Sequence, residues 1–169
     1  MKTATIVYIT RPGTHIREVL LALKSKVVGV GKRFGYGGKI KDGESATRCT
    51  VRETEEESGG ITIEEKNLNP MAIIDFYKDD MPFGNPFFRV LFYVCDTYRG
   101  KASSTDEMKD PEWFSVDNLP FHEMKAGDEL VVPFILHGQM RKGWIRFNGE
   151  TEELIAYEVT NARTEDLVM

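Results

Sequence analysis

The sequence has few cysteines, no long apolar run and no excess of positive charge. Cys49 and Cys95 are its only thiols, a pattern that favours two buried, reduced side chains over a disulfide framework. No apolar run approaches the roughly 20 residues of a membrane span, and the N-terminus does not fit a signal peptide. The formal net charge of −5 argues against binding of extended nucleic acid through a large basic surface. We therefore expect a cytoplasmic protein without a membrane partner.

The composition is that of one globular domain. The chain has 169 residues, of which 41% are hydrophobic and 29% are charged, enough to bury a core without disulfide or metal staples. It contains no linker, repeat or low-complexity stretch, so residues 1–169 are expected to form a single domain. The sequence is compatible with a monomer and with a homodimer alike.

Residue patterns predict an α/β fold in which helices cover the faces of a sheet. β-branched and aromatic runs predict strands at 5–10, 19–23, 73–77, 87–94, 112–114, 144–147 and 154–157. The turn signals Pro12-Gly13 and Asn148-Gly149 predict hairpins. Helices are expected at 45–58, with Ser45 as the N-terminal cap and Gly59-Gly60 as the stop, and at 130–140.

A glycine-rich stretch precedes the first helix. Residues 29–43 include six glycines, too many for the interior of a helix or strand, which predicts a shaped loop. Gly35, Gly37 and Gly38 would let the backbone approach the helix closely. A carbonyl of this loop, which we assign to Gly38, could then join the shell of a bound metal ion.

The helix at 45–58 carries an acidic run with a defined orientation. Glu53, Glu56 and Glu57 fall on one stripe at i, i+3 and i+4, which continues the small residues Ala46, Cys49 and Thr50, whereas Glu55 points to the opposite face. Three carboxylates that face the protein repel one another and lose solvation, so they need a cation. Oxygen ligands of this kind suit Mg²⁺, with Mn²⁺ as a substitute.

Two further residues complete this chemistry. Glu44 lies at the junction of loop and helix, and Arg52 is placed to pair with Glu56 one turn on. Mg²⁺ held here could polarise a phosphoryl oxygen and lower the pKa of an attacking water. A structural alternative treats the glutamates as a solvated face, in which case Glu56→Gln would leave Mg²⁺ affinity unchanged.

The spacing of these residues resembles the Nudix box. Gly38, five residues, Glu44, seven residues and then residues 52–59 match that motif, while Thr54 and Gly60 stand where the family prefers bulky aliphatic residues. The resemblance implies the Nudix fold, a mixed β-sheet sandwiched between α-helices. It also implies a hydrolase that acts on phosphoric anhydride bonds.

The resemblance extends along most of the chain to the MutT-like group, which includes the mammalian oxidised-purine nucleoside triphosphatase. It implies hydrolysis of a (deoxy)nucleoside triphosphate to the monophosphate and pyrophosphate. By this carry-over, Glu53, Glu56 and Glu57 bind metal and one of the last two acts as base, with Arg52 among the catalytic residues. Glu107 would add an outer carboxylate, and Lys24 would approach the phosphates.

The base-binding residues match that group only in part. Phe34 replaces an asparagine, Lys125 replaces a stacking tryptophan, and Gly127-Asp128 replaces a pair of aspartates, so Asp128 alone remains. Phe34 could stack on a base, although packing in the core or at the rim is the commoner role of an aromatic residue. The expected substrate-binding residues are Lys24, Phe34, Lys39 and Asp128, with 8-oxo-dGTP as a candidate substrate.

Two other kinds of function remain open at this point. The substrate could be a nucleoside diphosphate sugar, a dinucleoside polyphosphate or the 5′ end of RNA. Alternatively, the chain could be a non-catalytic nucleotide-binding Nudix module, against which the complete set of glutamates speaks.

Overall fold

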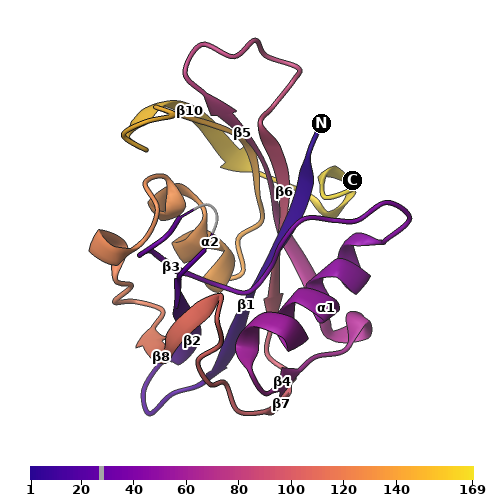
Figure 1. Cartoon of the computed structure of the whole chain (residues 1–169), viewed down its shortest axis with the longest axis vertical. Coiled ribbons are helices and arrows are strands. Elements are labelled where there is room, and N and C mark those ends of the chain that lie inside the picture. The colour runs from indigo at the N-terminus through magenta and orange to yellow at the C-terminus, as the bar shows by residue number, and fades with distance from the viewer. Residues whose placement is uncertain (27–28) are drawn as a thin grey trace.

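The structure is a computed structural model that describes residues 1–26 and 29–169 (Figure 1). Its strands are β1 (Thr3–Pro12), β2 (Arg17–Lys24), β3 (Arg33–Phe34), β4 (Ile61–Thr62), β5 (Asn69–Lys78), β6 (Phe88–Cys95), β7 (Arg99–Gly100), β8 (Met108–Ser115), β9 (Arg141–Phe147) and β10 (Leu154–Asn161). The α-helices are α1 (Ala46–Ser58) and α2 (Val132–Leu136), and short 3₁₀ helices are η1 (Glu65–Asn67), η2 (Phe121–Glu123), η3 (Asp128–Leu130) and η4 (Thr164–Asp166).

The main sheet is mixed, in the order β10-β9-β5-β6-β1-β2-β3, and β8 also pairs with β2. The pairs β1–β6 and β5–β9 are parallel, whereas the β1–β2, β5–β6 and β9–β10 pairs are antiparallel. Strand β1 joins the two parts of the sheet, because its residues 3–9 pair with β6 and its residues 10–12 pair with β2. Strands β4 and β7 form a separate small sheet.

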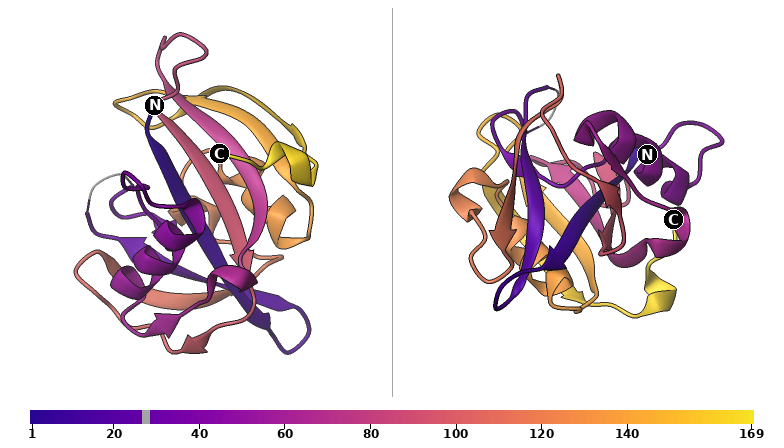
Figure 2. Two further views of the ribbon diagram at one scale, coloured as in Figure 1. Left: turned by 90° about the vertical axis from the view of Figure 1, so that its right-hand side faces the viewer. Right: turned by 90° about the horizontal axis from the view of Figure 1, so that it is seen from below.

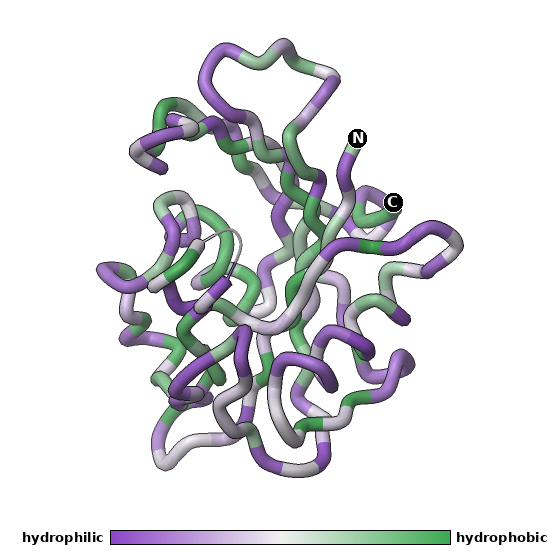
Figure 3. Tube along the Cα trace, viewed as in Figure 1, coloured by the Kyte–Doolittle hydropathy of each residue, from purple (hydrophilic) through white to green (hydrophobic). Residues whose placement is uncertain are grey.

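The alternation of side chains along the central strands builds one core on each face. On β1, Val7 and Ile9 belong to the cluster beneath α1, while Tyr8 belongs to the cluster beneath α2. The two helices accordingly lie on opposite sides of the central strands (Figure 2). Apolar residues are concentrated along these strands, whereas α1 is mostly hydrophilic (Figure 3). The predicted sheet with helices on its faces is confirmed.

Helix α1 begins and ends where the sequence predicts. The Ser45 side chain accepts a hydrogen bond from the backbone N–H of Arg48 at 3.2 Å, which satisfies one of the free donors of the first turn. Gly59 adopts the left-handed conformation, with φ of 68°, and so ends the helix. Cys49 and Thr50 are fully buried on the face that packs toward β1, as the stripe of small residues predicts.

Two local predictions are wrong in extent. The helix expected at 130–140 is confined to α2, because Pro133 occupies its first turn and Gly138 takes a φ of 81° soon after its end. The second hairpin is not closed by a two-residue Asn148-Gly149 turn. Instead, the Asn148 side chain accepts hydrogen bonds from the backbone N–H groups of Glu150 and Thr151, and the connection continues to residue 153.

Both cysteines are buried and free, as predicted. Among the helices that the structure describes, none is long and apolar enough to cross a membrane.

Candidate active site

A cavity of about 380 Å³ lies between the glycine-rich loop, α1 and the strands β1, β5, β6 and β9. Most residues predicted for the site line this cavity: Lys24, Phe34, Gly38, Lys39, Glu53, Glu57, Glu107 and Asp128. Arg52 and Glu56 do not line it. Residues far apart in sequence therefore meet around one space.

The glycine-rich loop lies along β1 at close range. Val7 and Tyr36 exchange two backbone hydrogen bonds, and the Thr5 N–H donates to the Gly38 carbonyl at 3.0 Å. A Cβ atom on Gly37 would lie 1.9 Å from the Thr5 carbonyl oxygen, which no side chain tolerates. The glycines are thus required by the approach of two backbones, as the sequence predicts for this loop.

The buried thiol of Cys49 joins the loop to α1. Its Sγ lies 3.5 Å from the Gly38 carbonyl and 3.4 Å from the Lys39 carbonyl. Burial raises the pKa of this thiol to about 11, so it stays protonated and can donate to the loop. The Gly38 carbonyl oxygen also accepts from the Thr5 N–H. Its role as a metal ligand stays a prediction.

Glu57 is the most deeply buried carboxylate of α1, with 2% of its side chain exposed. One of its oxygens lies 3.1 Å from Lys24 Nζ, and the other accepts from the Gly37 N–H at 3.1 Å. Burial raises its pKa, while the Lys24 ammonium and the Gly37 N–H act in the opposite direction. Lys24 therefore lies in the cavity wall beside Glu57 and partly compensates the buried charge, while its approach to the substrate phosphates stays a prediction.

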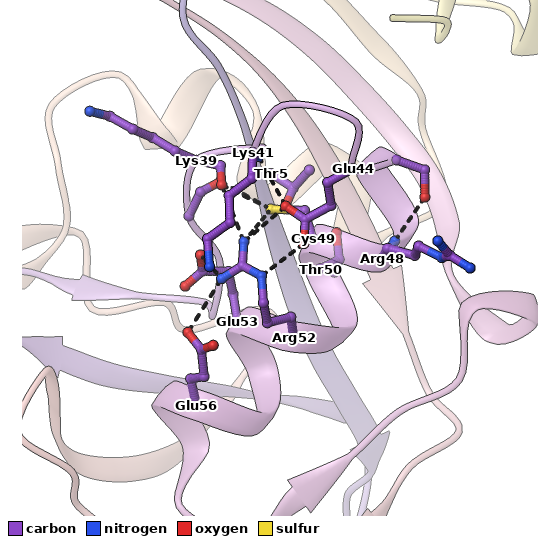
Figure 4. Close-up of polar contacts among 12 residues, drawn as sticks. Thr5, Lys39, Lys41, Glu44, Arg48, Cys49, Thr50, Arg52, Glu53 and Glu56 are labelled. Carbon is purple, nitrogen blue, oxygen red and sulfur yellow. Dashed lines mark hydrogen bonds and ion pairs between the residues drawn. The ribbon is translucent and has the colours of Figure 1, made fainter.

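Arg52 is the centre of a second cluster of charges (Figure 4). Its guanidinium contacts both oxygens of Glu44 at 2.8 and 3.0 Å, Glu53 at 2.6 Å and Glu56 at 3.3 Å. The bond from Arg52 holds the pKa of Glu44 at about 2. The predicted pairing with Glu56 is confirmed, but the bidentate pairing with Glu44 is the shorter one. This pairing joins the middle of α1 to the end of the loop that precedes it.

The predicted inward stripe of glutamates is correct for two of its three members. The side chains of Glu53 and Glu57 are 14% and 2% exposed, whereas Glu56 is 57% exposed. The reason is geometric, since neighbouring residues on a helix are about 100° apart. When Glu57 faces the protein interior, Glu56 lies at the edge of the buried face of α1. Glu55 is exposed on the opposite side, as predicted.

The oxygen atoms of Glu53, Glu56 and Glu57 are ligands that suit a hard divalent cation, although all three carboxylates pair with Arg52 or Lys24 in this structure. A Cβ atom on Gly38 would lie 2.5 Å from a carboxylate oxygen of Glu53, so the carboxylate faces the bare backbone of the loop. Within the described ranges, no three acidic, histidine or cysteine side chains are gathered closely enough to hold a metal ion. Glu53 and Glu56 instead contact Arg52, and Glu57 contacts Lys24.

The rest of the cavity is apolar and was largely missed by the sequence reasoning. Six phenylalanines line it: Phe34, Phe76, Phe87, Phe88, Phe92 and Phe147. The alternation of Phe88, Val90 and Phe92 along β6 was a signal for this wall, because alternate residues of a strand share a face. Phe34 is half-buried and forms part of the wall.

Lys125 and Asp128 are the two charged residues of the cavity that come from the segment around η3. Asp128 is only 8% exposed, and burial raises its pKa to about 7. The prediction that Asp128 lies at the site agrees with its place in the cavity wall, and Lys125 joins it there. Gly127, with φ of 100°, packs against Ile145 instead.

The two departures from the Nudix box have local explanations. Thr54 is fully buried, and its hydroxyl donates to the Thr50 carbonyl at 2.7 Å, so the polar group is satisfied within α1. A Cβ atom on Gly60 would lie 2.3 Å from the Lys101 carbonyl oxygen, so a bulky residue would push the two backbones apart.

The chain is similar to known proteins over most of its length. Residues 1–134 match the family described as NUDIX domain. The chain is 34% identical over 148 residues to a protein of Danio rerio named oxidized purine nucleoside triphosphate hydrolase, covering 88% of each chain. A Mus musculus protein of the same name is 27% identical over 155 residues and covers 92% of each.

A solved structure of the MutT protein from Bacillus halodurans superposes with a TM-score of 0.75 at 23% identity, covering 94% of this chain and 97% of that one. This likeness shows the fold. Members of the family generally use divalent metal ions. The family match over residues 1–134, together with the relative that is 34% identical over 88% of the chain, shows that the chain is a hydrolase of the Nudix family.

Proposed function

We propose that the chain is a Mg²⁺-dependent pyrophosphohydrolase that converts a (deoxy)nucleoside triphosphate to the monophosphate and pyrophosphate. One observation carries the proposal: a single cavity combines two carboxylates of α1, those of Glu53 and Glu57, with three lysines and a wall of aromatic rings. The charged part suits a polyphosphate with its cation, and the aromatic part suits a stacked base.

Glu53, Glu56, Glu57 and the Gly38 carbonyl are the proposed Mg²⁺ ligands, with Glu107 as an outer carboxylate. When bound, the ion supplies charge stabilisation at a phosphoryl oxygen and a lower pKa for the attacking water. Lys24 and Lys39 both line the cavity, and we assign them to the phosphates. The Lys24 ammonium, which neutralises Glu57, would then be shared with the substrate.

Glu56 or Glu57 is the proposed base that accepts a proton from the attacking water. Burial raises the pKa of Glu57, which makes it a stronger acceptor than an exposed carboxylate. Glu56 is exposed and held by Arg52, so its oxygen stays accessible to water. In either case Arg52 positions α1 against the loop rather than touching the substrate.

The identity of the base is a separate question. The relatives in Danio rerio and Mus musculus are named for oxidised purines, which supports 8-oxo-dGTP as a substrate to test first. Against it, Phe34 and Lys125 cannot reproduce an asparagine and a tryptophan, so only Asp128 supports this specificity. A site that reads a base through buried hydrogen bonds loses discrimination when partners are replaced.

The test is a panel of nucleotides incubated with Mg²⁺, followed by identification of both products. We expect monophosphate and pyrophosphate from at least one (deoxy)nucleoside triphosphate. Equal kcat/KM for 8-oxo-dGTP and dGTP would rule out the preference for oxidised purines but not the pyrophosphohydrolase activity. Turnover restricted to nucleoside diphosphate sugars, dinucleoside polyphosphates or RNA 5′ ends would contradict the proposed substrate class and identify another. Tight nucleotide binding without turnover would instead indicate a non-catalytic module.

A further inference from the structure

Three lysines from distant parts of the sequence lie at one edge of the cavity, outside the proposed metal site. Lys2 precedes β1, Lys39 belongs to the glycine-rich loop and Lys78 ends β5. Sheet pairing places these segments beside one another. The Arg89 N–H on β6 donates to the Lys2 carbonyl at 2.9 Å, and Ala4 pairs with Lys39 in an isolated bridge.

The three ammonium groups stand over two adjacent rings, Phe87 and Phe88, which line the cavity and lie 5.0 Å apart between centroids. Lys78 Nζ is 3.8 Å and Lys2 Nζ is 5.0 Å from the Phe87 centroid. Lys39 Nζ is 5.8 Å from the Phe88 centroid, as is Lys2 Nζ. Lys39 itself lines the cavity, whereas Lys2 and Lys78 reach it only through these rings. We call these three residues the lysine rim.

The positive charge of the lysine rim is not neutralised within the described part of the chain. A ring face stabilises an ammonium group, but it carries no net charge to cancel that of the lysine. The ion pairs that lysines form in residues 1–26 and 29–169 all involve other lysines. Asp79 follows Lys78 directly, but its carboxylate accepts from the Gly149 N–H at 3.0 Å.

The surroundings make this concentration of positive charge unusual. The chain as a whole has a formal net charge of −5, and the cavity contains the carboxylates of Glu53, Glu57 and Glu107. The Lys39 carbonyl faces Arg52, whereas its side chain extends away from α1 (Figure 4). Ammonium groups gathered beside a cavity attract a polyanion that the rest of an acidic protein repels.

We propose that the lysine rim is a polyphosphate-binding site that works without a metal ion. It captures the polyphosphate chain of an incoming nucleotide before the chain reaches the carboxylates of α1. This inference rests on the proposed function, since the polyphosphate is that of the same substrate. Because the lysine rim acts on capture rather than on the reaction, it should affect kcat/KM and leave kcat nearly unchanged.

The decisive experiment is a calorimetric titration with inorganic tripolyphosphate at low salt, in buffer freed of divalent ions by a chelating resin. The wild type should bind it, and added KCl should weaken this binding. In the double variant Lys2→Met/Lys78→Met, binding should weaken about tenfold or more. Methionine keeps an unbranched stem against the rings, so the variant should fold, and thermal unfolding would check this. Lys2→Arg/Lys78→Arg keeps both charges and should retain binding.

The double variant Lys66→Met/Lys101→Met is the matched control, because it changes the net charge by the same amount. Both lysines are exposed and lie outside the cavity, and Lys66 pairs with Glu64 at 2.9 Å. Its affinity for tripolyphosphate should stay within about twofold of the wild type. Equal weakening in the two methionine variants would show that total charge alone matters and would overturn the proposal. A wild type that does not bind tripolyphosphate without metal would overturn it as well.

Kinetics with Mg²⁺ separate this proposal from the proposed function. For the nucleoside triphosphate, kcat/KM of Lys2→Met/Lys78→Met should fall about tenfold at low salt and approach the wild type at high salt, with kcat within about twofold. If no triphosphate is hydrolysed but the pattern of tripolyphosphate binding is present, the pyrophosphohydrolase function fails and the lysine rim stands. If hydrolysis occurs and this variant matches the wild type in both kcat/KM and binding, the function stands and the lysine rim fails.

Discussion

Four glutamates within five positions of α1 have four different surroundings. Glu53 faces the backbone of Gly38 and contacts Arg52, Glu57 is buried against Lys24, Glu56 is exposed beside Arg52, and Glu55 is exposed without a charged partner in the described chain. The residue type is constant, so position on the helix alone determines which carboxylate reaches the cavity.

The first prediction concerns Glu57. Replacement by Gln keeps the shape of the side chain but removes the negative charge that we assign to the metal and, with Glu56 as the alternative, to proton transfer. We expect kcat to fall by roughly 10²- to 10⁴-fold, the usual range for loss of such a group. Steady-state kinetics with Mg²⁺ would measure it.

Glu55→Gln is the matched control, because Glu55 belongs to the same helix but is exposed outside the cavity. Its kcat should stay within about twofold of the wild type, as surface substitutions usually do little. Retention of full activity in Glu57→Gln would contradict the assigned role of Glu57.

A second prediction concerns the dependence of stability on pH. Burial raises the pKa of Asp128 to about 7, against the opposing effects of the Lys125 ammonium and backbone N–H, while Glu129 adds to the rise. The folded state then binds this proton more tightly than the unfolded state. Stability should decrease as pH rises from about 4, where an ordinary aspartate ionises, to about 7.

Urea unfolding at pH 5 and pH 8 would test this effect. Because other groups titrate as well, the quantity to compare is the difference between the wild type and Asp128→Asn, whose amide does not titrate. The wild type should lose on the order of 2 kcal/mol more than the variant between these pH values. Equal losses would show that Asp128 does not carry this pH dependence.

At the scale of elements, the loop before α1 and the helix itself are held by different kinds of contact. The loop approaches β1 backbone to backbone at Gly37, whereas at Gly38 it approaches the end of the Glu53 side chain. Arg52, in the middle of α1, is bound to Glu44 at the end of the loop. A substitution in the loop can therefore affect the fold or the site, depending on which neighbour it meets.

This difference gives a paired prediction for Gly37→Ala and Gly38→Ala. The new methyl group on Gly37 would lie 1.9 Å from the Thr5 carbonyl, so the Tm should fall by several degrees or more and activity should fall with it. On Gly38 it would displace a flexible carboxylate, so activity should fall at least tenfold while the Tm stays within a few degrees. Thermal unfolding and kcat/KM would be measured for both. Equal losses of Tm would refute this distinction.

At the scale of the whole molecule, the two cores lie on opposite faces of the sheet, and the apolar wall of the cavity is continuous with the core beneath α2 through residues such as Val90 and Phe92. Both faces of the sheet carry an apolar cluster, and the two α1 carboxylates of the cavity are already compensated, Glu53 by Arg52 and Glu57 by Lys24 and the Gly37 N–H. The fold therefore does not depend on a bound cation for charge compensation, although the proposed reaction does.

Removal of divalent ions should accordingly separate activity from stability. Addition of EDTA should abolish turnover, and excess Mg²⁺ should restore it, while the Tm without substrate should change by only a few degrees. Circular dichroism and an activity assay on the same sample would test this. Cooperative unfolding on chelation would contradict the compensation by Lys24 and Arg52, and full activity in EDTA would contradict a metal-dependent reaction.

The sequence alone determined α1 with its Ser45 cap and Gly59 stop, the loop before it and the strand runs, because these depend on residues within a few positions of one another. It also indicated the family, since the Nudix box is a continuous stretch.

Only the tertiary structure decided which residues share the cavity. Lys24 reaches Glu57 across 33 positions, and the phenylalanines of β5, β6 and β9 form one wall only after the sheet has assembled. The short length of α2 and the exposure of Glu56 were likewise fixed by packing. The burial of Lys125 and Asp128 was also decided by the tertiary structure, because the cavity that they line is formed by elements from distant parts of the sequence.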